Sequence, residues 1–302
     1  MKSFSSDFIS FAPDFMLHDS RLLQPARPTP TPAPHAAGAA ALLARFNVRV
    51  LGEGKPPLIF CNGFGCNQHV WRYLTAALAT RYQLVLFDYV GTGKADPTAY
   101  DPIKYASLHG YAQDVVAICQ ALNLHDAVII GHSVGATIAM LAAIEAPEHF
   151  AQVVLLAASP CYLNEPGYRG GFDLADVEQL LTLFADDDHA WANPFAQLLL
   201  GPTSTGSAME ELAGLFCEMD PVVARQLARV TFLADNRADV PQLRLPTLVL
   251  QCSHDMAVPR EVATYLLDHL PQGTLVQLQA TGHCPHLSAP METLAALESF
   301  LA

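Results

Sequence analysis

Short apolar runs alternate with longer segments of helical periodicity along most of the 302-residue chain. Several of the short runs lack polar alternation, which is typical of strands covered on both faces. The predicted strands are 46–51, 57–62, 83–88, 127–132, 151–158, 246–252 and 274–279. The predicted helices among them lie near 68–80, 108–122, 134–146, 260–270 and 291–301. This alternation predicts an α/β fold with a mostly parallel, twisted sheet flanked by helices.

The strand pattern stops between Ser159 and Asp235, where several helical segments replace it. These predicted helices lie near 173–186, 188–199, 206–218 and 220–233. An all-helical insertion in a parallel α/β fold is most simply a lid over the carboxyl ends of the strands, where such folds keep their sites. We therefore predict a helical lid of residues 159–235 on a core formed by residues 41–158 and 236–302.

The first 40 residues differ in composition from the rest of the chain. Their tract QPARPTPTPAPHAAGAA, residues 24–40, is rich in proline and alanine, and its prolines argue against a strand or a helix start. We therefore predict that residues 1–40 form a flexible extension. The opening segment MKSFSSDFISFAPDF contains acids and no sustained apolar core, so a secretory signal is not expected. A membrane span is not expected either, because no apolar run approaches about 18 residues.

Composition and charge narrow the classes of partner. Hydrophobic residues make up 51% of the chain, enough to bury a large core. A formal net charge of −13 without any block of Lys and Arg argues against a surface for nucleic acid or anionic membranes. The seven cysteines stand singly without a CxxC pair, which fits reduced thiols and a cytoplasmic location.

The pentapeptide GHSVG, residues 131–135, interrupts one apolar run and contains a candidate nucleophile. A serine hydroxyl attacks only when a base takes its proton and a sharp strand-to-helix turn holds it clear of the sheet. Ser133 has an apolar strand before it and the helical run ATIAMLAAIEA after it, which is the expected context. The alternative is an ordinary turn, in which glycine and serine are common.

A base and an orienting acid follow the serine in the order expected for this fold class. Asp255 comes just after the strand predicted at 246–252, and His283 comes just after the strand at 274–279. The sequence therefore predicts a triad of Ser133, Asp255 and His283. Taken singly, the aspartate fits a turn or helix cap and the histidine fits a surface loop.

Two other interpretations concern the segment HCPH, residues 283–286. His286 competes for the role of base, but its position after Pro285 indicates that it hydrogen-bonds locally or begins the next helix. A zinc site is disfavoured because no second ligand pair lies at metal-site spacing. No metal or cofactor is expected.

The reaction also needs donors for the negative oxygen of a tetrahedral intermediate. One is expected from the backbone N–H of Val134, which follows the nucleophile, and the other from the loop NGFGCNQHVW. Phe64 should supply this second N–H while its ring lines the pocket, although a plain glycine turn is the alternative. His132 is expected at the pocket edge.

Seven segments together resemble the RsbQ-like subfamily of the α/β-hydrolase superfamily, which is related to the plant strigolactone and karrikin receptors. They are NGFGCNQHVW, FDYVGTGKAD, YDPIKYASLHGYAQDV, GHSVGATIAM, SPCYLNEPGYRGGF, LQCSHDMAVP and GHCPHLSAP. The resemblance extends from Asn47 to the C-terminus. It implies an α/β-hydrolase core with a four-helix, V-shaped lid and the triad and oxyanion hole named above. It also implies an apolar pocket lined from the lid by Phe172, Trp191, Phe195 and Phe232, for which ordinary helix packing is the alternative.

The resemblance leaves two functional classes open. One is a serine hydrolase that acts on a small, largely apolar ester or lactone, butenolide-like, and also serves as a ligand sensor in stress signalling. The other is a metabolic carboxylesterase or C–C bond hydrolase without a signalling role. A signalling partner of the PAS-containing phosphatase type is expected as a separate chain. The segment GPTSTG, residues 201–206, and the N-terminal extension are not features of that subfamily.

Overall fold

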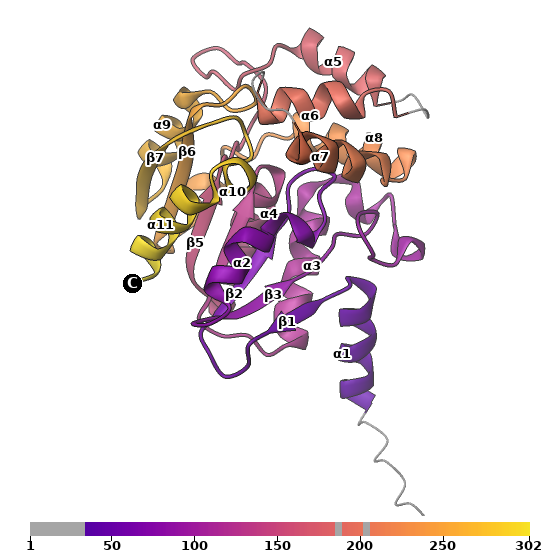
Figure 1. The fold of residues 1–302 in the computed structure, drawn as a ribbon, viewed down its shortest axis with the longest axis vertical. Coiled ribbons are helices and arrows are strands. Elements are labelled where there is room, and N and C mark those ends of the chain that lie inside the picture. Colours follow the sequence, from indigo (N-terminus) through magenta and orange to yellow (C-terminus); the bar gives the residue numbers. More distant parts are fainter. Residues whose placement is uncertain (1–33, 185–188, 202–205) are drawn as a thin grey trace, which may run out of the picture.

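A computed structural model describes residues 34–184, 189–201 and 206–302 (Figure 1). Its sheet has the strand order β1-β3-β2-β4-β5-β6-β7, in which β1 is antiparallel to β3 and every other pair is parallel. The strands are β1 (Arg49–Leu51), β2 (Pro57–Cys61), β3 (Gln83–Leu86), β4 (Ala127–His132), β5 (Phe150–Leu156), β6 (Thr247–His254) and β7 (Gly273–Thr281). The predicted α/β fold with a mostly parallel sheet is confirmed.

Helices flank this sheet (Figure 1). Those of the core are α2 (Arg72–Leu78), α3 (Leu108–Ala121), α4 (Val134–Glu145), α9 (Arg260–His269), α10 (Pro285–Ser288) and α11 (Pro290–Leu301). Short 3-10 helices are Gln68–Trp71, Pro97–Ala99, Lys104–Ala106, Pro147–His149 and Val240–Gln242. Helix α4 is buried along nearly its whole length and is apolar on all sides, as expected for a helix in the interior. It directly follows β4, all of whose residues are buried.

Helix α1 (Pro34–Arg45) corrects the prediction for residues 1–40. The Pro/Ala tract does start a helix, because proline is tolerated at the first helical position, where its missing N–H has no intrahelical partner. The alanine-rich residues that follow are strong helix formers. Residues 1–33 of the predicted extension lie outside the described residues. Strand β1 is shorter than predicted, because Asn47 turns the chain with a φ of 47° after α1 ends.

Four helices occupy the described part of the predicted lid, above the carboxyl ends of the strands (Figure 1). They are α5 (Leu174–Leu183), α6 (Ala192–Leu200), α7 (Ser207–Cys217) and α8 (Pro221–Phe232). Helix α6 begins later than predicted, since His189 has a left-handed φ of 54°. Residues 185, 186 and 188 of the predicted helices lie outside the described residues, as do residues 202–205 of the GPTSTG segment. The V shape of the lid stays a prediction.

The parallel strands bring the candidate site together at one edge of the sheet. Ser133 follows β4, Asp255 follows β6 and His283 comes two residues after β7, so all three lie at carboxyl ends. Such ends meet beneath the lid, where α/β folds keep their sites. Among the described helices, none is long and apolar enough to cross a membrane.

Candidate active site

Ser133 stands in a strained turn between β4 and α4. Its φ of 56° and ψ of −126° are rare for a residue with a side chain and cost on the order of 1–3 kcal/mol. A Cβ on Gly131 would lie 2.3 Å from the carbonyl oxygen of Gly135, and one on Gly135 would lie 2.2 Å from that of Asn62. Larger residues at either glycine would push strand and helix apart. The geometry therefore favours a nucleophile turn over an ordinary one.

A continuous chain of hydrogen bonds joins the serine to an aspartate. In the tautomer that serves a base, Ser133 Oγ donates to Nε2 of His283 at 2.7 Å, and Nδ1 of His283 donates to Oδ2 of Asp255 at 2.8 Å. The other carboxylate oxygen, Oδ1, accepts from the N–H groups of Ala257 at 2.9 Å and Val258 at 3.1 Å. Asp255 therefore both closes a turn and orients the histidine. The turn residue and the orienting acid, given as alternatives from the sequence, are thus both found in this one side chain.

Three backbone contacts fix the position of His283. Gly282 adopts a left-handed φ of 86° and donates its N–H to the carbonyl of His254 at 2.7 Å. The N–H of His283 donates to the carbonyl of Leu199 in α6 at 2.6 Å, which links the loop directly to the lid. Nε2 of His132 donates to the carbonyl of His283 at 2.8 Å. Burial and the neighbouring His283 lower the pKa of His132 to about 3, so His132 is neutral and no second base.

His286 lies in α10 and is fully buried against Trp71 and His132, with ring centroids 4.7 Å and 4.4 Å apart. The prediction that it begins a helix is confirmed, since Pro285 is the first residue of α10. The alternative, a local hydrogen bond, is wrong: neither ring nitrogen has a partner among the described residues. Burial lowers its pKa well below the usual value. His286 therefore packs as a neutral ring.

The candidate oxyanion donors come from the start of α4 and from the loop after β2. Val134 is the first residue of α4, so its N–H has no partner within the helix. Phe64 follows β2 between Gly63 and Gly65. A Cβ on Gly63 would meet Nδ1 of His132 at 2.6 Å, and Gly65 has a left-handed φ of 66°, so this loop depends on both glycines. Neither the Phe64 nor the Val134 N–H donates to another group in the described structure, and their joint role stays a prediction.

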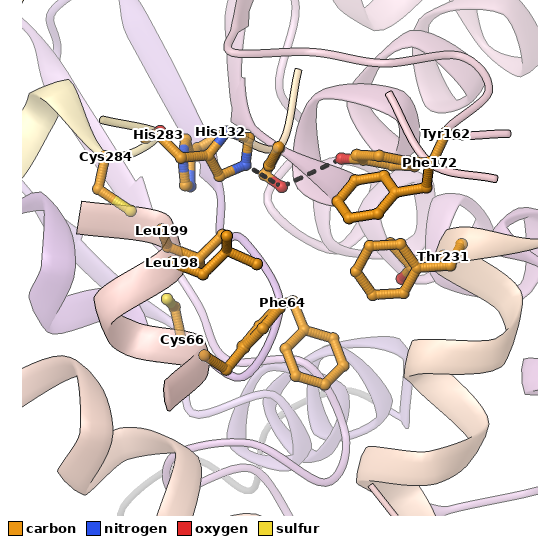
Figure 2. A pocket seen from close by; sticks show the side chains of 14 residues that line it. Phe64, Cys66, His132, Tyr162, Phe172, Leu198, Leu199, Thr231, His283 and Cys284 are labelled. Atoms are coloured by element: carbon orange, nitrogen blue, oxygen red, sulfur yellow. Dashed lines mark hydrogen bonds between the residues drawn. The ribbon is translucent and has the colours of Figure 1, made fainter. Parts of the chain in front are cut away.

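A pocket opens at the serine beneath the lid (Figure 2). It is largely apolar, and His283 and Tyr162 approach the Ser133 hydroxyl from opposite sides. Its walls are formed by Phe64, Cys66, His132, Ser133, Tyr162, Phe172, Phe195, Leu198, Leu199, Thr231, Phe232, Ala257, His283 and Cys284.

The pocket wall includes all but one of the residues predicted to line it. Phe64, His132, Phe172, Phe195 and Phe232 lie on it, and whether they bind a substrate stays a prediction. The prediction for Trp191 is wrong, because its ring packs behind this wall. Its neighbours there are Phe64, Phe184 and Phe216, with ring centroids at 6.2, 4.4 and 5.5 Å.

Sequence reasoning missed Tyr162, whose hydroxyl lies 3.3 Å from Ser133 Oγ. Burial raises the pKa of this phenol, so it stays protonated. The segment SPCYLNEPGYRGGF offered a signal, because it contains Tyr162 and is one of those that carry the family resemblance. No such signal marked Leu198, Leu199 or Thr231, which face the pocket only because of how α6 and α8 are rotated.

Comparison with known proteins identifies the fold family. A family model described as alpha/beta hydrolase fold matches residues 56–290. The chain belongs to the α/β-hydrolase fold family. The solved structure of a hydrolase from Oleispira antarctica matches this α/β-hydrolase with a TM-score of 0.85 and 34% sequence identity. The match covers 87% of this chain and 97% of the Oleispira antarctica chain.

Curated plant relatives narrow the relation further. A protein of Oryza sativa subsp. japonica described as probable esterase D14L is 38% identical over 81% of this α/β-hydrolase and 91% of its own length. The karrikin insensitive 2 receptor CA of Petunia hybrida is 36% identical over 81% and 91%. Strigolactone esterase D14 of Arabidopsis thaliana is 34% identical over 83% and 94%. The resemblance to strigolactone and karrikin receptors predicted from sequence is confirmed.

Proposed function

We propose that this α/β-hydrolase cleaves a small, largely apolar ester or lactone, such as a butenolide, by a serine mechanism. The observation that carries the proposal is the unbroken hydrogen-bond chain from Ser133 through His283 to Asp255, which ends on an apolar pocket. A strained serine, a histidine nitrogen placed to accept its proton and an orienting carboxylate form the constellation used in acyl transfer.

In the proposed mechanism Ser133 Oγ attacks the carbonyl carbon while His283 Nε2 takes its proton. The N–H groups of Phe64 and Val134 stabilise the negative oxygen of the tetrahedral intermediate. Collapse of this intermediate breaks the bond to the alkoxide, which receives the proton from His283. Water, deprotonated by the same nitrogen, then hydrolyses the acyl-enzyme. Asp255 holds the imidazole in the required tautomer and stabilises its protonated form.

The pocket supports a small and uncharged substrate. Its aromatic and aliphatic walls contain no Lys, Arg, Asp or Glu among the described residues. A charged group would lose its hydration there without a partner, which costs several kcal/mol or more. Side chains of α6 and α8 form part of the pocket wall, so the lid limits the size of a bound substrate.

One contact favours a sensor role beyond plain hydrolysis. The His283 N–H donates to the Leu199 carbonyl of α6. A shift of His283 during turnover would therefore displace the end of a lid helix or break this hydrogen bond. The relative from Petunia hybrida that is named as a karrikin insensitive 2 receptor supports the same role. A separate signalling protein, of the PAS-containing phosphatase type, would then bind the altered lid. A metabolic carboxylesterase or C–C bond hydrolase is the alternative, with the same triad and no partner.

The test uses the full chain and its Ser133→Ala variant. Hydrolysis of p-nitrophenyl acetate should fall by several orders of magnitude in the variant, because only binding and the oxyanion hole remain. Intact-protein mass spectrometry after incubation with esters, lactones and butenolides should detect an adduct in the wild type only. Unchanged turnover by a folded Ser133→Ala protein would overturn the triad.

A further inference from the structure

The pocket wall carries an unpaired hydroxyl that the triad does not use. Thr231 lies in α8 on the wall opposite His283 (Figure 2). The residue is only 3% exposed, and Oγ1 has no hydrogen-bond partner among the described residues. Leaving a hydroxyl unpaired in such a place costs the free energy of removing it from water without a new hydrogen bond in return.

Other threonines in helices of this chain avoid that cost. Oγ1 of Thr182 donates to the carbonyl four residues earlier at 2.9 Å, and Thr264 and Thr293 do the same at 3.4 and 3.0 Å. Helical threonines commonly make this bond. Thr231 does not make it, although α8 offers the carbonyl of Leu227. The Thr231 hydroxyl thus points away from the acceptor that its own helix offers. A valine would fill the same space on this wall without leaving a polar group unpaired.

The neighbours of Thr231 do not explain the hydroxyl either. Phe232 and Phe172 beside it on the pocket wall are apolar, and their rings pack 5.7 Å apart. Tyr162 is the other hydroxyl on this wall, and it bonds Ser133 Oγ. Thr231 is therefore suited to meet a polar atom that arrives with a ligand.

The direction of the reaction decides which part of a substrate meets this wall. His283 must lie beside the leaving oxygen in order to protonate it, so the alcohol part extends toward His283. The acyl part then lies toward the opposite wall, where Thr231 is. This assignment rests on the proposed serine hydrolase function.

We propose that the Thr231 hydroxyl binds a carbonyl or ether oxygen in the acyl part of the substrate. The preferred substrates are then oxygenated esters or lactones, in which an acyl oxygen accepts a hydrogen bond from Thr231. Simple hydrocarbon esters fit the apolar walls but leave the hydroxyl unpaired. A site built to bind a polar group discriminates against analogues that lack it.

The experiment compares matched p-nitrophenyl esters: 4-oxopentanoate against pentanoate, and 5-oxohexanoate against hexanoate. In Thr231→Val, kcat/KM for at least one oxo ester should fall about three- to tenfold relative to its hydrocarbon partner, the worth of one neutral hydrogen bond. Thr231→Ser keeps the hydroxyl and should keep the wild-type ratio. Thr182→Val removes a lid hydroxyl that is already bonded to its own helix, and it should leave kcat/KM unchanged for all four esters.

The proposal would be overturned if Thr231→Val changed kcat/KM equally for the oxo ester and the hydrocarbon ester of both pairs, so that each ratio stayed within twofold of the wild-type ratio. It would also be overturned by a ratio that Thr231→Ser fails to restore. Pentanoate turnover in the same variant separates this outcome from failure of the proposed function, since a loss of the triad chemistry abolishes hydrolysis of all four esters.

Discussion

Replacing Asp255 with asparagine keeps the shape of the side chain but reverses one hydrogen bond. Oδ1 of Asp255 accepts from the N–H groups of Ala257 and Val258 at 2.9 and 3.1 Å, while Oδ2 accepts from Nδ1 of His283 at 2.8 Å. Only an oxygen can accept from those two N–H groups, so the amide oxygen takes the Oδ1 position. The amide NH2 group of the Asp255→Asn variant must therefore face His283.

That NH2 group donates to Nδ1, which forces the imidazole proton onto Nε2. Nε2 lies 2.7 Å from Ser133 Oγ and can no longer accept the serine proton. The histidine then has the wrong tautomer for a base, an effect known to lower kcat about 10⁴-fold in serine proteases. This corresponds to about 5 kcal/mol in the activation barrier. The turn at Ala257 and Val258 keeps its acceptor, so the free energy of unfolding should change little.

The assay measures kcat on p-nitrophenyl acetate at saturating substrate, with circular dichroism and thermal unfolding as checks of the fold. Asp268→Asn, the same exchange at an exposed position of α9, is the matched control and should stay within twofold of wild type. Asp255→Ala should lose rate and also stability, because it removes the turn acceptor. A loss of less than tenfold in a folded Asp255→Asn protein would refute the tautomer argument.

Two further predictions concern the buried histidines. His283→Ala should reduce p-nitrophenyl acetate hydrolysis about as severely as Ser133→Ala, whereas His286→Ala should cost tenfold or less in rate. The His286→Ala variant has a cavity beside Trp71, and its free energy of unfolding, measured in urea, should fall by roughly 2–4 kcal/mol. A larger loss of rate in His286→Ala than in His283→Ala would contradict the assignment of His283 as the base. The second prediction concerns the pH dependence of stability. The pKa of His132 is about 3 in the folded chain, against its ordinary value of 6.5 in the unfolded chain. Between these pH values the unfolded chain therefore binds one more proton than the folded chain. The free energy of unfolding should therefore fall as pH drops from about 6.5 toward 3. Measured by urea unfolding between pH 7.5 and 5.0, this fall should be shallower in His132→Asn than in the wild type. An equal fall in both proteins would argue against the lowered pKa of His132.

The sequence by itself predicted the sheet and the candidate triad, for a reason that is local. A buried strand such as β4 needs a continuous apolar run, and all six of its residues are buried. Ser133 and Asp255 each follow such a run, whereas His283 follows β7, a less buried strand at the edge of the sheet. Parallel strands bring all three carboxyl ends together. Chain order and strand ends were therefore enough to bring together residues that lie 122 and 28 positions apart.

Only the tertiary structure decided which side chains form the pocket. Trp191 and Phe195 are both buried lid aromatics, yet one packs behind the wall and the other faces the cavity. Thr231 faces the cavity because of the rotation of α8, and Leu199 meets His283 because α6 ends against that loop. Helix rotation and docking result from many weak packing contacts between distant segments, which no short stretch of sequence encodes. The local pattern therefore determines the elements and the order of the chemical groups, whereas the packing of the lid determines the shape and polarity of the site.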